Sequence, residues 1–98
     1  MFICIAGKNQ CAVDTINFLL NRNISKKKLL ILPNYKDNGK DGWQPSLKKV
    51  ANKNKLKIIN LKNLYSINDL FFFSMEYEKI IDIKKFKTTP KGRYFFLL

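Results

Sequence analysis

Two short segments of the sequence follow apolar runs and carry polar groups that could hold a ligand. The first is "AGKN", Ala6 to Asn9, and the second is "SMEYE", Ser74 to Glu78. In the first, Lys8 and the free backbone N–H groups at the start of a helix favour an anion. A simple tight turn at Gly7 explains the segment equally well, because it matches neither the Walker loop nor the G-x-G-x-x-G pattern.

The second segment places Glu76 at the carboxyl end of a predicted strand, "LFFFSM". Backbone amides and carbonyls at such a strand end could bind the polar edge of a planar heterocycle, with Met75 and Tyr77 as apolar walls. The residues alone favour the plainer alternative, in which Glu76 only caps a turn. A third stretch, "NGKDGWQPSL" at 38–47, is predicted to be a loop that could act as a mobile flap. Its Trp43 is expected to lie in the core rather than against a ligand.

The sequence offers few other groups for catalysis. It has no histidine to exchange protons near neutral pH, and no serine or cysteine lies in a recognisable nucleophile setting. Cys4 and Cys11 lack metal-ligand spacing, and we expect both to be buried apolar residues in a reducing cytoplasm. The scattered carboxylates form no evident acid–base pair. The residues alone therefore predict neither a working enzyme nor a metal site.

Alternating apolar runs and amphipathic stretches predict the elements that position these segments. Helices are expected at about 10–21, with Asn9 as the N-cap, and at 45–53, with Pro45 in the first turn. Strands are expected at 1–6, 29–33, 56–59, 70–75 and 94–98. This alternation indicates a single α/β domain over residues 1–98, Rossmann-like, with a mostly parallel sheet and helices on both faces.

The predicted topology also says where a ligand would bind. In a doubly wound sheet of order 3-2-1-4, the winding reverses between the first and fourth strands, and ligands bind outside the carboxyl ends of the strands at that reversal. The turns at 7–9 and 74–77 follow the first and fourth predicted strands. We therefore expect these two turns to face each other across one crevice.

Composition bounds the classes of partner. The chain has 98 residues and a formal net charge of +12, and nearly all of its 19 basic residues are lysine. A reader of phosphates or bases would use more bidentate arginine, so nucleic-acid binding is not favoured. No signal peptide is visible and "LFFFSM" is too short to cross a bilayer, so we expect a cytoplasmic protein with no membrane partner. The sequence does not reveal the oligomeric state.

Three segments together resemble the folate-dependent formyltransferases: "IAGKNQCAVDTINFLL", "LPNYKDNGKDGWQPSLKKVA" and "LYSINDLFFFSMEYEKIIDIKKFKT". The resemblance covers residues 1–88 and is closest to the sugar N-formyltransferases, which formylate the amine of a nucleotide-linked amino sugar, here taken to be dTDP-linked. It implies a cytoplasmic protein of lipopolysaccharide O-antigen biosynthesis that uses N10-formyltetrahydrofolate. The pterin edge would lie on the backbone around Phe73, Ser74, Met75, Glu76 and Tyr77. The cleft near the sugar nucleotide would be lined by Gly7, Lys8 and Asn9.

The last residues depart from the pattern of this family. After "FKT" the family normally continues into a strand with F-N-x-H-x-S-L-L-P, whose Asn and His are catalytic together with a later Asp. Residues 91–98, "KGRYFFLL", contain neither that Asn nor that His. We therefore expect a sheet that is incomplete at its C-terminal end, from a truncated or frameshifted reading frame, and we assign no catalytic residue.

The predicted function is that of a truncated sugar N-formyltransferase that is inactive on its own. Two alternatives remain open from the sequence. One is a non-catalytic module that binds folate or nucleotide, since "AGKN" and "SMEYEKII" are both intact. The other is a basic nucleic-acid-binding protein, which net charge alone supports.

Overall fold

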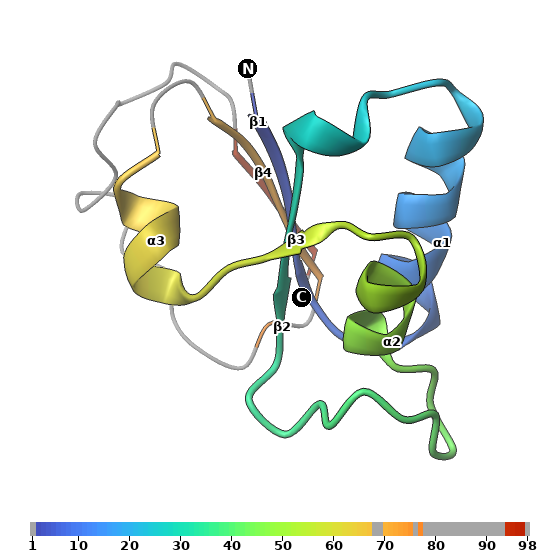
Figure 1. Ribbon diagram of the computed structural model, residues 1–98. Coiled ribbons are helices and arrows are strands. Elements are labelled where there is room, and N and C mark those ends of the chain that lie inside the picture. Colours follow the sequence, from blue (N-terminus) through green and yellow to red (C-terminus); the bar gives the residue numbers. More distant parts are fainter. Residues whose placement is uncertain (1, 68–69, 76, 78–93, 98) are drawn as a thin grey trace.

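One parallel sheet organises the molecule. The computed structural model describes residues 2–67, 70–75, 77 and 94–97 (Figure 1). Its sheet has the order β3-β2-β1-β4-β5, and every neighbouring pair of strands is parallel. The strands are β1 (Phe2–Gly7), β2 (Leu29–Pro33), β3 (Lys57–Ile58), β4 (Leu70–Met75) and β5 (Tyr94–Leu97). The predicted order and the Rossmann-like α/β fold are therefore confirmed.

Helices cover both faces of this sheet. Helices α1 (Asn9–Asn21) and α2 (Leu47–Lys53) lie on one side, and α3 (Leu61–Tyr65) lies on the other (Figure 1). A 3-10 turn, Lys26–Lys28, leads into β2. In the part of the chain that the structure describes, no helix is long and apolar enough to cross a bilayer.

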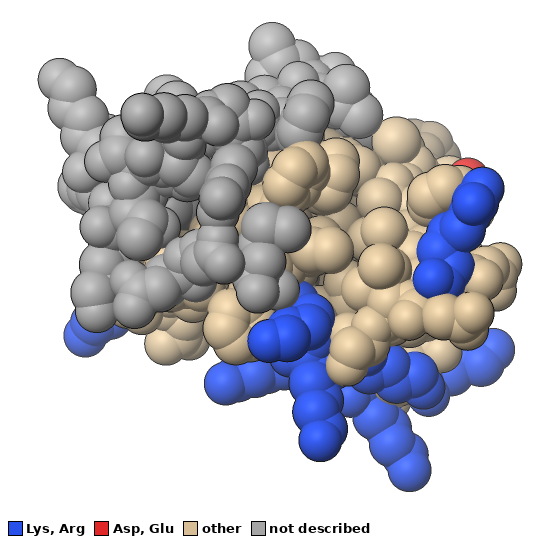
Figure 2. Space-filling view, turned by 90° about the horizontal axis from the view of Figure 1, so that it is seen from above, with Lys and Arg blue, Asp and Glu red and all other residues tan. Residues whose placement is uncertain are grey.

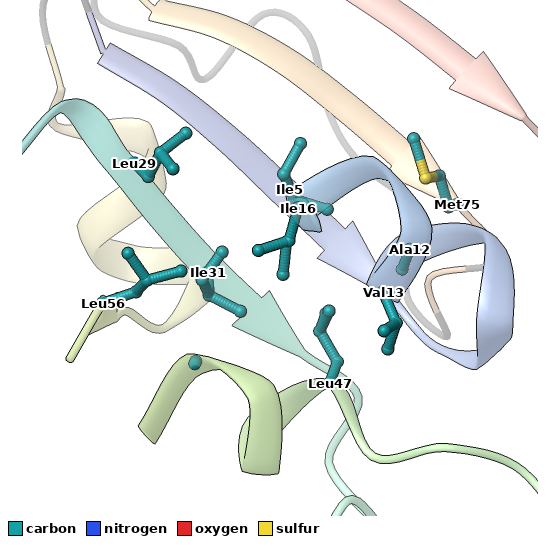
Figure 3. Close-up of a cluster of buried hydrophobic side chains, with 10 residues drawn as sticks. Ile5, Ala12, Val13, Ile16, Leu29, Ile31, Leu47, Leu56 and Met75 are labelled. Carbon is teal, nitrogen blue, oxygen red and sulfur yellow. The ribbon is translucent and has the colours of Figure 1, made fainter. Parts of the chain in front are cut away.

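The core has two layers because successive strand residues point to opposite faces of the sheet. In β1, Ile5 points toward α1 and α2, whereas Cys4 and Ala6 point toward α3. The larger cluster joins strand residues to the apolar stripes of α1 and α2 (Figure 3). Its buried members are Ile5, Ala12, Val13, Ile16, Leu29, Ile31, Leu47, Ala51, Leu56 and Met75. Burial on both faces explains why β1 and β2 read as continuous apolar runs.

The starts of α1 and α2 differ from their predicted positions. Lys8, not Asn9, is the N-cap residue of α1, and it makes no capping bond through its side chain. Helix α2 begins at Leu47 rather than Pro45, since the Ser46 hydroxyl accepts the Lys49 N–H at 3.0 Å. Helix α3 is not among the helices predicted above; a reciprocal pair of hydrogen bonds between Asn60 and Asn63 opens it.

Two side chains expected in the core are at the surface. Trp43 is 93% exposed, on a loop that Asp37 and Asp41 attach to the first turn of α2. Cys11 is also exposed, whereas Cys4 is buried as predicted. Cys11 lies on α1 just outside the buried stripe that begins at Ala12. The burial expected of both cysteines is therefore confirmed for Cys4 and wrong for Cys11.

Candidate functional site

The carboxyl ends of β1 and β4 lie side by side. Gly7 pairs with Met75 in the parallel register, and the Lys8 N–H donates to the Met75 carbonyl at 3.1 Å. The chain leaving β1 is thus fixed to the end of β4, at the point where the strand order reverses. The predicted proximity of the two turns is confirmed for the residues that are described, whereas the crevice between them stays a prediction. Glu76 lies outside the described residues, and Asn9 is placed only as the first residue of α1.

Gly7 is required by this junction. Its φ is +126°, and a Cβ built on it would lie 1.7 Å from the Met75 carbonyl oxygen. No side chain fits in that space, and an L-residue would be strained at this φ. The sequence left open whether this segment is an anion site or a structural turn. The structural turn explains why residue 7 is a glycine. Its contact with a substrate stays a prediction.

The residues predicted to bind folate could contact it through their backbone more than through their side chains. Ser74 and Met75 are buried, and the Met75 sulfur accepts the Thr15 hydroxyl at 3.4 Å on the α1 side of the sheet. The Met75 side chain therefore faces α1 rather than forming an open wall. Phe73 and Tyr77 are half-buried and belong to the two opposite core clusters. Their predicted contact with a cofactor remains a prediction.

A cavity of about 780 Å³ adjoins Lys8. Among the described residues, its lining comes from Lys8 and from the loop between β2 and α2, including Lys36, Lys40 and Trp43. None of the described residues at the end of β4 lines it. The structure thus brings one predicted substrate residue, Lys8, together with loop residues to which the sequence assigned no ligand.

Two aspartates, Asp37 and Asp41, anchor the loop between β2 and α2. The Asp37 carboxylate accepts the Gly39 N–H at 3.0 Å, the Ser46 hydroxyl at 2.5 Å and the Lys48 N–H at 2.9 Å. At the start of the loop, the Asn34 N–H donates to the Gly7 carbonyl at 3.2 Å. These bonds connect the loop to both the β1 turn and the first turn of α2. The predicted flap is therefore an anchored loop.

Asp41 adds a second attachment to α2. Its carboxylate accepts the Lys49 ammonium at 2.8 Å and the Ser46 N–H at 2.9 Å. The hydrogen bond from Lys49, and then that from Ser46, lowers the pKa of Asp41 below its usual value. Because folding lowers this pKa, the stabilisation from the attachment is fully present above the pKa of Asp41 in the unfolded state. It is lost as the pH falls through the pKa of Asp41 in the folded state.

The two cysteines should differ sharply toward thiol reagents. Cys4 is buried, and burial raises the pKa of its thiol far above the usual range, so it stays protonated. Cys11 is exposed. We expect a disulfide reagent to modify one thiol rapidly in the native protein and both in denaturant, with mass spectrometry locating the native adduct on Cys11. Equal labelling of both thiols in the native state would contradict this placement of β1.

Comparison with known proteins finds two similar solved structures. No protein-family model and no curated protein sequence matches the chain. The solved N-formyltransferase from Helicobacter canadensis, in complex with folinic acid and dTDP-3-aminofucose, is 38% identical with a TM-score of 0.84, over 89% of this chain and 33% of that chain. WlaRD, a sugar 3N-formyl transferase solved in the presence of dTDP and 5-N-formyl-THF, is 42% identical with a TM-score of 0.83, over 89% and 32%.

The sheet order, the helices on both faces and this identity make the chain similar to the Rossmann-like part of these two solved formyltransferases. The resemblance to the sugar N-formyltransferases drawn from the sequence is confirmed. The chain spans about a third of the length of the two solved proteins.

Proposed function

We propose that this chain supplies the folate and nucleotide-sugar cleft of a sugar N-formyltransferase. The observation that carries the proposal is its 38–42% identity, over 89% of its length, to two such proteins solved with a formyl-folate compound and a dTDP compound. The junction of β1 and β4 supports it, because that junction lies where doubly wound sheets bind ligands.

The reaction of the whole protein would move a formyl group from N10-formyltetrahydrofolate to the amine of a dTDP-linked amino sugar. Such a transfer would join the amine nitrogen to the formyl carbon and break the bond from that carbon to N10, while the proton lost by the amine would be replaced by a proton gained at N10. Such a reaction needs a proton acceptor and donors to the oxyanion. The role in cytoplasmic O-antigen synthesis rests on the same resemblance.

The described residues fit the folate in a limited way. Because Ser74 and Met75 are buried, they can offer it only backbone groups, while half-buried Tyr77 can offer part of a ring surface. When bound, the folate would supply the formyl group. Lys8 is exposed next to this strand end and would place a positive charge beside an anionic substrate.

We expect the chain of 98 residues to bind these ligands without turning them over. It has no histidine, and no described carboxylate or cysteine lies at the β1–β4 junction except Cys11, which is next to Met75 on α1. Removing a catalytic set of this kind costs several orders of magnitude in rate. The chain itself would then act as the non-catalytic binding module that the sequence left open.

Calorimetric titration tests the proposal. We expect heat of binding with 5-formyltetrahydrofolate and with dTDP, and no formylated product when the purified chain is incubated with N10-formyltetrahydrofolate and a dTDP-amino sugar. The absence of heat with both ligands at millimolar concentration would refute the binding function. Measurable product, detected by mass spectrometry, would refute the expected lack of turnover.

A further inference from the structure

Lysines gather where β2 and β3 begin. Three of them, Lys26–Lys28, form the 3-10 turn that leads into β2. Lys57 starts β3 and pairs with Leu30, the second residue of β2, so these lysines lie at the same end of two neighbouring strands. Two more come directly before β3. All these side chains are exposed, and together they form the lysine patch: Lys26, Lys27, Lys28, Lys53, Lys55 and Lys57.

The lysine patch lies at the end of the sheet opposite to the β1–β4 junction. The Lys28 ammonium is 5.2 Å from the centre of the Phe2 ring, and Phe2 is the first residue of β1. The junction lies at the other end of β1, at Gly7. The 6 residues of β1 span about 20 Å, since a strand rises about 3.3 Å per residue. A partner on the lysine patch would therefore not cover the junction.

No described carboxylate neutralises the lysine patch. The described acidic residues are Asp14 on α1 and, in the loop beyond the far end of β2, Asp37 and Asp41, of which Asp41 pairs with Lys49. Figure 2 looks onto the end of the sheet where β1 begins; Lys and Arg side chains gather along one side of it, and acidic side chains are almost absent. Like charges gathered in this way repel one another over about 8 Å at physiological ionic strength. An anionic partner would relieve that repulsion.

We propose that the lysine patch docks the protein on the surface of a membrane rich in anionic lipids. Clusters of about four to eight basic residues bind such surfaces, because each residue close to the lipid strengthens binding about fivefold. The expectation of no membrane partner rested on the lack of a spanning segment, and a contact with the membrane surface needs none. This inference does not depend on the function proposed above.

A nucleic acid, the other common polyanion, suits the lysine patch less well. Every residue of the patch is a lysine, a hydrated point charge without the planar fork by which arginine binds phosphates and bases. Among the described residues, the exposed large apolar side chains are Phe18, Tyr35 and Trp43, all outside the patch, so it has no exposed ring on which a base could stack. A lipid surface requires only closely spaced positive charge.

Co-sedimentation with vesicles tests the proposal. We expect the 98-residue chain to bind vesicles made of equal parts of phosphatidylcholine and phosphatidylglycerol at physiological ionic strength, and not to bind vesicles of phosphatidylcholine alone. The double variant Lys27→Gln/Lys57→Gln should bind the anionic vesicles about thirtyfold more weakly, because two residues are lost that each contribute about fivefold. The absence of binding by the parent chain would overturn the proposal.

A matched double variant controls for net charge. Lys36→Gln/Lys40→Gln removes the same charge from exposed lysines of the loop beyond the other end of β2. We expect it to weaken vesicle binding by less than about threefold, because these lysines would lie more than a Debye length from the lipid. Equal losses in the two double variants would mean that the vesicles attract the whole charge of the protein, and would refute a docking surface. Circular dichroism checks that both variants keep the fold.

The lone tryptophan reports the orientation of the unmodified chain. Trp43 is 93% exposed in the loop beyond the far end of β2, so its emission wavelength should not change when vesicles are added. A shift to shorter wavelength would place that loop in the lipid and overturn the proposal. Tighter binding to a DNA duplex than to vesicles at equal phosphate concentration, lost in Lys27→Gln/Lys57→Gln, would make a nucleic acid the partner instead.

Discussion

Replacing Gly7 with alanine is expected to lower the free energy of unfolding by about 3 kcal/mol or more. The new Cβ would meet the Met75 carbonyl oxygen at 1.7 Å, and the φ of +126° disfavours any L-residue. Relief would require β1 and β4 to separate, which would also break the bond from the Lys8 N–H to Met75. We therefore expect the substitution to disturb the fold and both predicted ligand positions together.

Urea denaturation followed by circular dichroism measures this effect. Gly42→Ala is the matched control, because a Cβ at Gly42 has no atom within 4 Å and its φ is not in the left-handed region. We expect that control to stay within about 0.5 kcal/mol of the parent chain. Similar unfolding midpoints for the Gly7 and Gly42 variants would show that the β1–β4 junction is not as tight as described.

Removing the carboxylate of Asp37 is expected to cost about 2 kcal/mol and to loosen the loop between β2 and α2. Three donors would lose their acceptor at once: Gly39 N–H, the Ser46 hydroxyl and Lys48 N–H. Helix α2 has only 7 residues, so it depends strongly on the groups bound at its first turn. Asp37→Ala should therefore affect both global stability and the shape of the cavity.

Urea denaturation measures the loss of global stability, and limited proteolysis measures the loosening of the loop. In Asp37→Ala, trypsin should cleave after Lys36 and Lys40 faster than in the parent chain, relative to cleavage after Lys27. Asp14→Ala is the control, because the Asp14 carboxylate lies exposed on α1 and accepts a bond from the Gln10 side chain. We expect it to change stability by no more than about 0.5 kcal/mol. Unchanged cleavage in the Asp37 variant would mean that other contacts hold the loop.

Much of the fold follows from local patterns in the sequence. The bounds of β2 and β4 are those predicted, since strands buried on both faces are apolar throughout and are bounded by polar residues. The order of the strands follows from right-handed crossovers once strands and helices alternate. This order also placed the turns after β1 and β4 together, which required no knowledge of a side-chain contact.

The features that escaped prediction depend on contacts between residues that pattern reasoning treats separately. The exposure of Trp43 follows from where Asp37 and Asp41 fasten the loop, and hydropathy carries no information about those bonds. The Asn60–Asn63 pair that opens α3 resembles ordinary connector sequence until its reciprocal geometry is formed. The two aspartates ahead of Pro45 and Ser46 were the available signal for an anchored loop.

The main-chain bond between Lys8 and Met75 has a consequence for how proteins of this kind diversify. Because it joins backbone atoms, the bond does not depend on which side chain Lys8 or Met75 carries, in contrast to Gly7, where a side chain would force the strand ends apart. Under the function proposed above, a change of preferred sugar or nucleotide would arise through residues 34–46, whose position depends on replaceable side chains. Homologous chains with different acceptors should accordingly differ most in that loop and least in the spacing of the two strand ends.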